Sequence, residues 1–287
     1  MSLGGNGRRQ QWLPIPRRND SLWRACYWAI NADYARGAAA DYGPAYKVLR
    51  DDITRNKGYL DGGPSYDLTR TYDAGRFVCP GALVDTSIVW GEPNNLWHWS
   101  TNCVTMACLM RFNALPSGDS RIIGKLWHTP DLGGIKIVYA PSLGNHFKLG
   151  WSDGVDYDLV QSTTVPTTHQ TYLLVGRFST NPVRAELWVN GVLEASKNGG
   201  RNCIASNATI RMFLDPTDSP VVPVLNAKIA MAGLWGRTLS TSEVTRLNTN
   251  PYAMWIPQTT PKGWFMGGGN GPHCQCCPGW LGSFHDM

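Results

Sequence analysis

The residues best suited to chemistry in this chain are its glutamates, and there are only four: Glu92, Glu186, Glu194 and Glu243. Hydrolysis of a glycosidic bond needs two carboxyl groups beside the scissile bond, one protonated and one ionised. None of the four has a carboxylate partner on alternate residues of one strand, and Glu243 stands where it would cap a helix. The sequence therefore predicts that the protein does not cleave glycans.

The histidines offer no other catalytic arrangement. They stand at positions 98, 128, 146, 169, 273 and 285, without the H-x-x-x-H spacing of a metal site. No G-x-S-x-G sequence marks a nucleophile on a sharp turn, and no glycine-rich loop that could hold phosphate precedes a helix. We therefore expect no enzyme activity and no cofactor. Calcium is the one ion for which the sequence offers candidate ligands.

A cluster of cysteines lies in the sequence PHCQCCPGW near the C-terminus. His273, Cys274, Cys276 and Cys277 carry the atoms that zinc prefers, and four such ligands can complete a tetrahedral site. Their spacing is tighter than that of a familiar zinc motif, because adjacent residues rarely converge on one ion. The alternative interpretation is a tail that docks or pairs through these residues.

Three aspartates fall close together in the sequence WSDGVDYDL. Asp153, Asp156 and Asp158 could bind calcium, because hard cations prefer carboxylates in loops. Turns prefer the same residues, since an aspartate side chain accepts hydrogen bonds from the backbone that follows it. The segment is a candidate ligand site, and a plain turn is the alternative.

Tryptophans crowd into the sequence VWGEPNNLWHW. Trp90, Trp97 and Trp99 could stack against the faces of sugar rings, since an indole offers a large flat apolar surface. They could equally cover the edge of a sheet or contact another subunit. Both interpretations require the tryptophans to be positioned by strands.

The chain around these residues has the composition of a strand-rich protein. Its 287 residues include 31 Gly and 19 Pro, only 16% are charged, and apolar residues alternate in many short segments. The segments expected to be strands are 22–30, 104–115, 121–127, 134–140, 146–154, 208–215 and 228–235. Asn190-Gly191 predicts a type I′ hairpin turn. We expect ten to twelve strands in two antiparallel sheets packed face to face.

One helix is expected among these strands. Ser240 precedes Glu243 by three residues, the spacing of a capping box at a helix start. The pair Asn250-Pro251 ends the helix after about two turns. So short a helix is not stable alone. It should therefore span 241–248 and lie on the surface of the sandwich.

The end of this region resembles a known family. The sequence GLWGRTLSTSEVTRLNTNPYAMW is similar to the closing signature of the concanavalin A-like jelly-roll domain, of the laminin G or pentraxin-like kind. The sequences YLLVGRFSTNPVRAELWVNGVLEAS and VTMACLMRF resemble its paired strands and its early core strand. The resemblance covers roughly residues 21–255 and implies an all-β, two-sheet antiparallel jelly-roll sandwich. Family members often hold calcium or sugar at one rim through acidic loops, which implies such a role for Asp153, Asp156 and Asp158.

The same resemblance carries an expectation about function, because such domains recur in bacteriophage structural proteins. It implies a non-enzymatic virion protein, a capsid decoration or tail component, that contacts other subunits and copies of itself, with host-surface glycans as a further ligand. Residues 1–20 hold no apolar signal core, so we expect synthesis in the host cytoplasm and a place in the virion. The alternative is a carbohydrate-binding lectin module of a secreted or cell-surface protein.

Two arms rich in glycine and proline are expected to flank the sandwich, at residues 1–20 and 256–287. Ordering such arms requires compensating contacts, some of which the sandwich itself could supply and the rest of which we expect from neighbouring subunits. The basic and aromatic residues expected to anchor them are Arg8, Arg9, Trp12, Arg17, Arg18, Trp264, Phe265, Trp280 and Phe284. The sequence thus predicts a subunit that its arms connect to its neighbours.

Charge and hydropathy argue against nucleic acid as a partner and against a membrane span. The net charge of +5 is modest, and outside the N-terminal arm no stripe of basic residues alternates with aromatic ones, so nucleic acid is not an expected partner. No apolar run approaches the ~20 residues of a membrane span.

Overall fold

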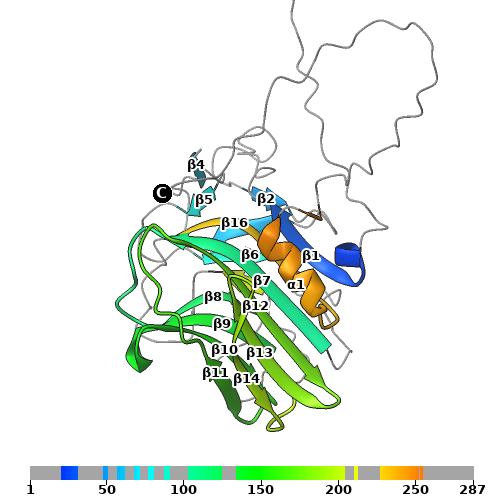
Figure 1. The fold of residues 1–287 in the computed structure, drawn as a ribbon. Helices are drawn as coiled ribbons and strands as arrows, with labels where there is room; N and C mark the ends of the chain where they lie inside the picture. The colour runs from blue at the N-terminus through cyan, green and yellow to red at the C-terminus, as the bar shows by residue number, and fades with distance from the viewer. Residues whose placement is uncertain are drawn as a thin grey trace, which may run out of the picture. The chain divides into compact units, whose positions relative to one another are not determined.

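The computed structural model describes residues 21–31, 48–50, 57–61, 68–71, 77–80, 87–90, 103–124, 134–203, 210–212, 227–251 and 253–254. For several short strands the description covers the backbone alone. Within these residues the chain forms sixteen strands, in two sheets of eight (Figure 1). The chain separates into two units, residues 1–257 and 258–287, and the second lies wholly outside the described residues.

Sheet A combines the long central strands with the last strand before the helix. Its members are β1 (Cys26–Asn31), β4 (Leu68–Thr71), β5 (Phe77–Pro80), β7 (Cys103–Phe112), β12 (Thr171–Thr180), β13 (Val183–Val189), β14 (Val192–Asn198) and β16 (Ala227–Trp235). Their order is β14-β13-β12-β7-β16-β5-β4, and β1 also pairs with β16. Every pairing is antiparallel.

Sheet B is built from the shorter strands. Its members are β2 (Val48–Arg50), β3 (Lys57–Asp61), β6 (Ser87–Trp90), β8 (Ser120–Gly124), β9 (Gly134–Ala140), β10 (His146–Ser152), β11 (Tyr157–Gln161) and β15 (Ile210–Met212). Their order is β11-β10-β9-β8-β15-β6-β3-β2, again antiparallel throughout. The predicted all-β, two-sheet jelly-roll sandwich is confirmed. The predicted number of strands was too small, because β2 to β6 have only three to five residues each.

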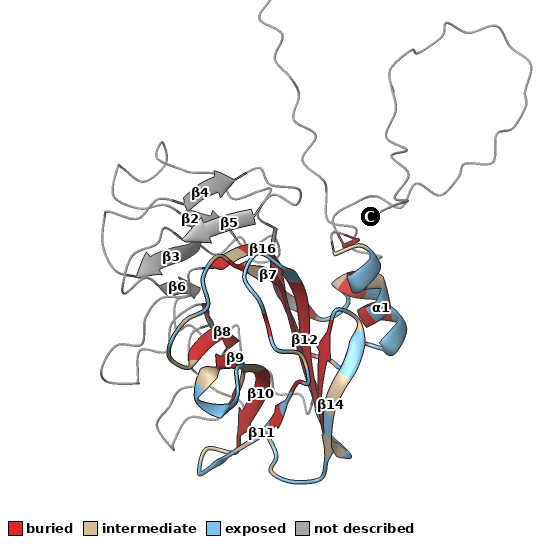
Figure 2. Ribbon diagram, turned by 60° about the vertical axis from the view of Figure 1, so that its left-hand side comes forward, coloured by how far each residue is buried: buried red, intermediate tan, exposed pale blue. Residues whose placement is uncertain are grey.

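The core between the sheets is apolar and rich in aromatic rings. Phe147 of sheet B stacks on Phe112 of sheet A, with ring centroids 6.2 Å apart, and meets Tyr172 edge-on at 5.2 Å. Leu187 and Val189 of β13 point into the same core, as their alternation predicts. Figure 2 shows buried residues running along β7, β12 and the strands of sheet B that face them. This burial on both sheets is what holds the sandwich together.

The other face of sheet A is covered by α1 (Thr241–Thr249). Val244 and Leu247 of the helix join Trp188 and Trp235 of the sheet in a second buried cluster. Because sheet A is buried on both faces, its central strands are almost continuously apolar.

The helix begins where the sequence predicts and ends one residue later, at Thr249. The Ser240 hydroxyl accepts a hydrogen bond from the Glu243 N–H at 3.2 Å, and Glu243 Oε2 accepts one from the Ser240 N–H at 2.9 Å, completing the capping box. The helix is nine residues long. Among the described residues, no helix has the length and apolarity to cross a membrane.

The first described segment is bound to the last strand. The indole N–H of Trp235 donates to the Leu22 carbonyl at 2.6 Å. The Arg237 guanidinium donates to the carbonyls of Ser21 at 2.6 Å and Arg24 at 2.8 Å. A short 3₁₀ turn at Ser21–Trp23 presents the carbonyls of Ser21 and Leu22. The strand predicted from residue 22 therefore begins at residue 26.

The hairpin between β13 and β14 contacts the helix through its turn. Asn190 and Gly191 both have positive φ, 49° and 77°, as a type I′ turn requires. A Cβ at position 191 would lie 2.8 Å from Nδ2 of Asn248 on α1. The predicted turn is therefore also a contact point between hairpin and helix.

Gly191→Ala should lower the free energy of unfolding by about 1–3 kcal/mol, because alanine must adopt a positive φ and crowd Asn248. Gly199→Ala is the matched control, since Gly199 has φ of 73° but nothing within 4 Å of a new Cβ. Urea denaturation of both variants should give the larger loss at position 191. Equal losses would show that the contact with the helix adds nothing.

Candidate functional site

The loop between β10 and β11 contains the aspartates that the sequence singles out. Asp153 Oδ1 accepts hydrogen bonds from the N–H groups of Val155 and Asp156, each at 2.9 Å. Gly154 has φ of 89°, which lets the chain reverse direction within four residues. The loop is thus a turn held by its own aspartate, as the alternative interpretation of this segment predicts.

Two basic residues bind all three aspartates. Arg201 Nη1 lies 3.0 Å from Asp153 Oδ2, and Arg201 Nη2 lies 2.7 Å from Asp156 Oδ2. Lys197 Nζ lies 2.6 Å from Asp158 Oδ1, and the other Asp158 oxygen accepts from the Arg201 N–H at 2.9 Å. We call these five residues the rim cluster. Its three carboxylates against two cations leave a net charge of −1.

These contacts lower the pKa values of Asp153 and Asp158. Hydrogen bonds from the backbone at Asp156 and Val155, aided by Arg201, lower the pKa of Asp153 to about 2. The backbone N–H of Arg201 is the main cause of a lowered pKa at Asp158. Among the described residues, no group of three or more His, Cys, Asp or Glu is arranged to hold a metal ion. A cation entering the rim cluster would have to compete with Arg201 for the same oxygens.

An exposed ring and a buried ring lie on opposite faces of sheet B at the rim, because Tyr157 pairs with Ser152 of β10 and the buried Trp151 pairs with Asp158. Tyr157 is 61% exposed and Val155 is 78% exposed, so both side chains contact solvent. Trp151 is fully buried, donates its indole N–H to the Arg201 carbonyl at 2.9 Å, and has Lys197 Nζ 5.8 Å from its ring centroid. The core tryptophan therefore fixes the charged groups, while the tyrosine ring faces solvent.

The other predicted site residues fall outside this arrangement. Trp90 is the last residue of β6, and its side chain lies outside the described residues. Also outside them are Trp97, Trp99, His273, Cys274, Cys276 and Cys277, and all the arm residues: Arg8, Arg9, Trp12, Arg17, Arg18, Trp264, Phe265, Trp280 and Phe284. Their predicted roles in glycan, metal or partner contact remain predictions.

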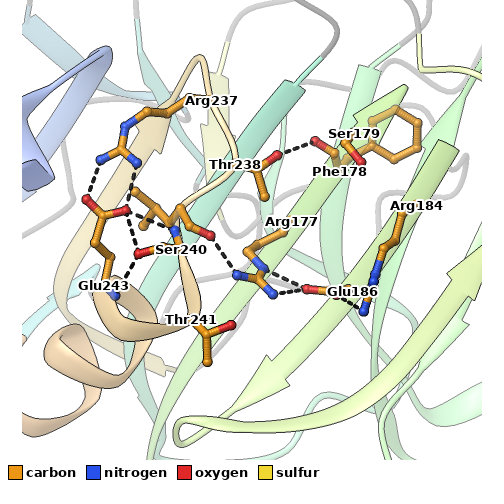
Figure 3. A pocket seen from close by; sticks show the side chains of 11 residues that line it. Arg177, Phe178, Ser179, Arg184, Glu186, Arg237, Thr238, Ser240, Thr241 and Glu243 are labelled. Atoms are coloured by element: carbon orange, nitrogen blue, oxygen red, sulfur yellow. Dashed lines mark hydrogen bonds and ion pairs between the residues drawn. The ribbon is translucent and has the colours of Figure 1, made fainter. Parts of the chain in front are cut away.

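A pocket of about 440 Å³ lies where β12, β13 and the start of α1 meet (Figure 3). At its centre is a buried ion pair, in which Arg177 Nε donates to Glu186 Oε2 at 2.7 Å. The same carboxylate binds Arg184 Nη2 at 2.6 Å and the Trp188 indole N–H at 3.1 Å. Arg177 Nη1 donates to the Leu239 carbonyl at 2.6 Å. The pair therefore connects sheet A to the segment that leads into the helix.

A second ion pair lines the other side of the pocket (Figure 3). Arg237 binds Glu243 through two hydrogen bonds, each of 2.7 Å. Burial acts to raise the pKa of Glu243, but Arg237 and the Ser240 N–H outweigh it and hold the value at about 2. This bidentate pair fixes the start of the helix against β16 and the first described segment.

The glutamates of this pocket are unsuited to acid–base catalysis. Burial raises the pKa of Glu186, but its hydrogen bonds with Arg177 and Trp188 more than offset this and lower it. A glycoside hydrolase needs one carboxyl that keeps its proton near neutral pH, and neither Glu186 nor Glu243 can. Glu194 accepts hydrogen bonds from two backbone N–H groups. Each described glutamate thus forms hydrogen bonds or ion pairs that stabilise the fold.

Several residues of these sites were missed from the sequence. Arg177 and Glu186 face each other in the register of β12 and β13, and the single charge of the apolar strand β12 could have indicated a partner of opposite charge on its neighbour. Nothing near Arg201 pointed to its partners, which lie more than forty residues earlier. Tyr157 was not predicted as a site residue, because tyrosine is common in strands.

No family model matches this sequence, and no curated protein sequence matches it either. Solved structures are similar in fold. Trypanosoma rangeli sialidase in complex with sialic acid is similar over 80% of this chain and 33% of its own, with a TM-score of 0.54 and 12% identity. The chain therefore spans about a third of that enzyme.

Two toxin domains are also similar. The binding domain of botulinum neurotoxin DC, in complex with SialylT, has a TM-score of 0.57 and 10% identity over 78% of this chain and 51% of its own. The binding domain of Paraclostridial Mosquitocidal Protein 1 has a TM-score of 0.59 and 10% identity over 80% of this chain and 55% of its own. Identities this low show a shared sandwich fold. The resemblance to laminin G, pentraxin or phage proteins in particular remains a prediction.

Proposed function

We propose that this chain is a non-enzymatic, lectin-like carbohydrate-binding module that contacts saccharide through its rim. The observation that carries the proposal is the exposed Tyr157, which stands in the chain between Asp156 and Asp158 of the rim cluster. The similarity in fold to binding domains, one of them in complex with SialylT, adds support. Of the two functions that the sequence suggested, the carbohydrate-binding module is therefore better supported than the virion protein.

The chemistry of the rim suits a sugar. A sugar ring has an apolar C–H face, which packs on an exposed aromatic ring, and hydroxyl groups at its edge, which need donors and acceptors. Tyr157 offers the ring, and Asp156, whose side chain is 54% exposed, offers carboxylate oxygens beside it. Arg201, 38% exposed, offers guanidinium N–H groups. Because Arg201 and Asp153 fix each other, little conformational entropy is lost when a ligand binds.

Binding without cleavage agrees with the state of the carboxylates. Asp153 at the rim and Glu243 in the pocket each have a pKa of about 2 and stay ionised at neutral pH. An ionised carboxylate accepts hydrogen bonds from sugar hydroxyls but cannot protonate a leaving oxygen. Glycans bound at the rim should therefore be recovered intact.

Tyr157→Ala should weaken saccharide binding about tenfold or more, because the stacking surface is lost while the fold remains. The purified chain would first be screened on a glycan array, and the best saccharide then titrated by calorimetry. Val192→Ala is the matched control, since Val192 is equally exposed, at 61%, but lies on β14 at the hairpin turn. Equal affinity of the two variants would exclude the rim, and the absence of any bound glycan would exclude the function.

A role as a structural subunit of a virion remains a further proposal, supported by the family resemblance. The arm residues that would contact neighbouring subunits lie outside the described residues. Limited proteolysis of the monomer beside an intact assembly tests it. Arms that resist cleavage equally in both would contradict the predicted contacts between subunits.

A further inference from the structure

The pocket between β12, β13 and the start of α1 has few hydrogen-bond acceptors left for a ligand (Figure 3). Glu186 binds Arg177 through one carboxylate oxygen and Arg184 through the other. Both oxygens of Glu243 bind Arg237. An ionised carboxylate accepts hydrogen bonds and donates none. The glutamates therefore fix the arginines of the pocket and contribute little of their own to the binding of a ligand.

Hydrogen-bond donors, by contrast, are in surplus in this pocket. A guanidinium carries five N–H groups. Among the described residues the one partner of the Arg184 guanidinium is Glu186, which lies 2.6 Å from Nη2, so Nε and Nη1 have no acceptor there. The Thr241 hydroxyl, which lines the pocket from the helix, likewise has no partner within the part of the chain that the structure describes. A ligand of this pocket must therefore supply the acceptors.

The charge of the pocket indicates which kind of acceptor fits. The described residues that line it include three arginines and two glutamates, a net charge of +1. Burial acts to raise the pKa of Glu186 and of Glu243, but the hydrogen bonds of their arginine partners outweigh it, so both are ionised at neutral pH. One further negative charge neutralises the pocket, whereas a dianion would leave a net charge of −1 beside two fixed carboxylates. The pocket is therefore suited to a monoanion.

A ligand can reach the pocket on the side of Arg184. The volume of about 440 Å³ lies in the range of small-molecule sites. The Arg184 side chain is 49% exposed, against 9% for Arg177 and 23% for Arg237. Arg177 is bound to the Leu239 carbonyl and to Glu186, and Glu186 in turn binds Arg184. Because these contacts position Arg184 before a ligand arrives, little conformational entropy is lost on binding.

We propose that this pocket is a second binding site, which takes the carboxylate group of a small acid onto the N–H groups of Arg184, with the Thr241 hydroxyl as a further donor. A hydrogen bond between a guanidinium and a carboxylate is about twice as strong as a neutral one. The site is separate from the rim cluster, in which Arg201 is bound to Asp153 and Asp156. The pocket should bind its acid whether or not the rim binds a saccharide.

Arg184→Gln is the test, because it removes the charge from an exposed side chain and leaves Glu186 bound to Arg177. Calorimetric titrations would use glucuronate, glucose and glucose 6-phosphate, which share one ring and carry a carboxylate, no charge and a phosphate. The unmodified chain should bind glucuronate most tightly of the three. Arg184→Gln should weaken that binding about tenfold or more, the effect of losing a hydrogen bond between charged groups.

Two further variants define the site. Thr241→Val keeps the shape of the side chain and removes the hydroxyl, so it should weaken glucuronate binding about fivefold, since a neutral hydrogen bond contributes less than a charged one. Arg24→Gln is the matched control, because Arg24 is also exposed and does not line the pocket. It should bind glucuronate like the unmodified chain.

The outcomes separate this site from the rim. The preference for glucuronate over glucose should persist in Tyr157→Ala and vanish in Arg184→Gln. A preference that vanishes in Tyr157→Ala and persists in Arg184→Gln would place the acid at the rim and overturn the pocket site. Glucose 6-phosphate bound as tightly as glucuronate would contradict the assignment of a carboxylate. If the unmodified chain binds no glucuronate, the pocket proposal fails, and the rim proposal is still decided by its own titrations.

Discussion

Glu186→Ala is expected to lower the free energy of unfolding by about 3–5 kcal/mol, the largest effect of any substitution considered for this protein. The side chains of Glu186 and Arg177 are only 6% and 9% exposed. Removal of the carboxylate leaves the Arg177 guanidinium buried beside Trp188 with its charge uncompensated. Urea denaturation should show a lower midpoint with an unchanged m-value.

A double variant controls for this result. Arg177→Met combined with Glu186→Leu removes both charges and should recover most of the lost stability, because no charge stays buried. Arg184 binds the same carboxylate but its side chain is 49% exposed, so Arg184→Ala should cost under about 1 kcal/mol. A loss below about 1 kcal/mol for Glu186→Ala would mean that water reaches the pair and that it contributes little.

The chain should also lose stability in acid through Glu243. Its folded pKa is about 2, below its ordinary value of 4.5. A carboxylate with a depressed pKa stabilises the fold above the unfolded value, and that contribution is lost as pH falls from about 4.5 to 2. The pKa difference corresponds to up to about 3 kcal/mol. Urea denaturation at several pH values should show this loss in the unmodified chain and a much flatter profile in Glu243→Gln.

Ser240→Ala is the matched control for the acid profile. It removes the hydroxyl from the capping box but leaves the Arg237–Glu243 pair, so it should cost about 1 kcal/mol at every pH and keep the acid dependence. A Glu243→Gln profile as steep as that of the unmodified chain would assign the acid sensitivity to other carboxylates, Asp153 among them.

The features predicted well from the sequence are those that depend on neighbours along the chain. The helix follows from Ser240 and Glu243, three residues apart, and the hairpin turn from Asn190 and Gly191. The strands β9 and β16 fall within one residue of their predicted bounds. Strands β2 to β6 were not predicted individually, because segments this short and polar give no clear period-two pattern.

The features that could not be predicted depend on which strands become neighbours in space. The sequence identified Asp153, Asp156 and Asp158, and the structure brings them together in one loop and its adjoining strand. Their cations come from across the sandwich edge, a pairing that local patterns do not encode. The sequence near Lys148 alternates as a half-exposed strand would, so the residue looked like an ordinary surface lysine. Its burial arises from the surrounding fold.

The bond between the first described segment and the last strand has a consequence for synthesis. The acceptor at Leu22 leaves the ribosome 213 residues before its donor at Trp235. At a synthesis rate of about 5–20 residues per second, that interval lasts roughly 10–40 seconds. During this time β1 lacks the strand it pairs with, because among the described strands its one partner is β16. The nascent chain must keep an apolar strand from aggregating until nearly all of the sandwich has been made.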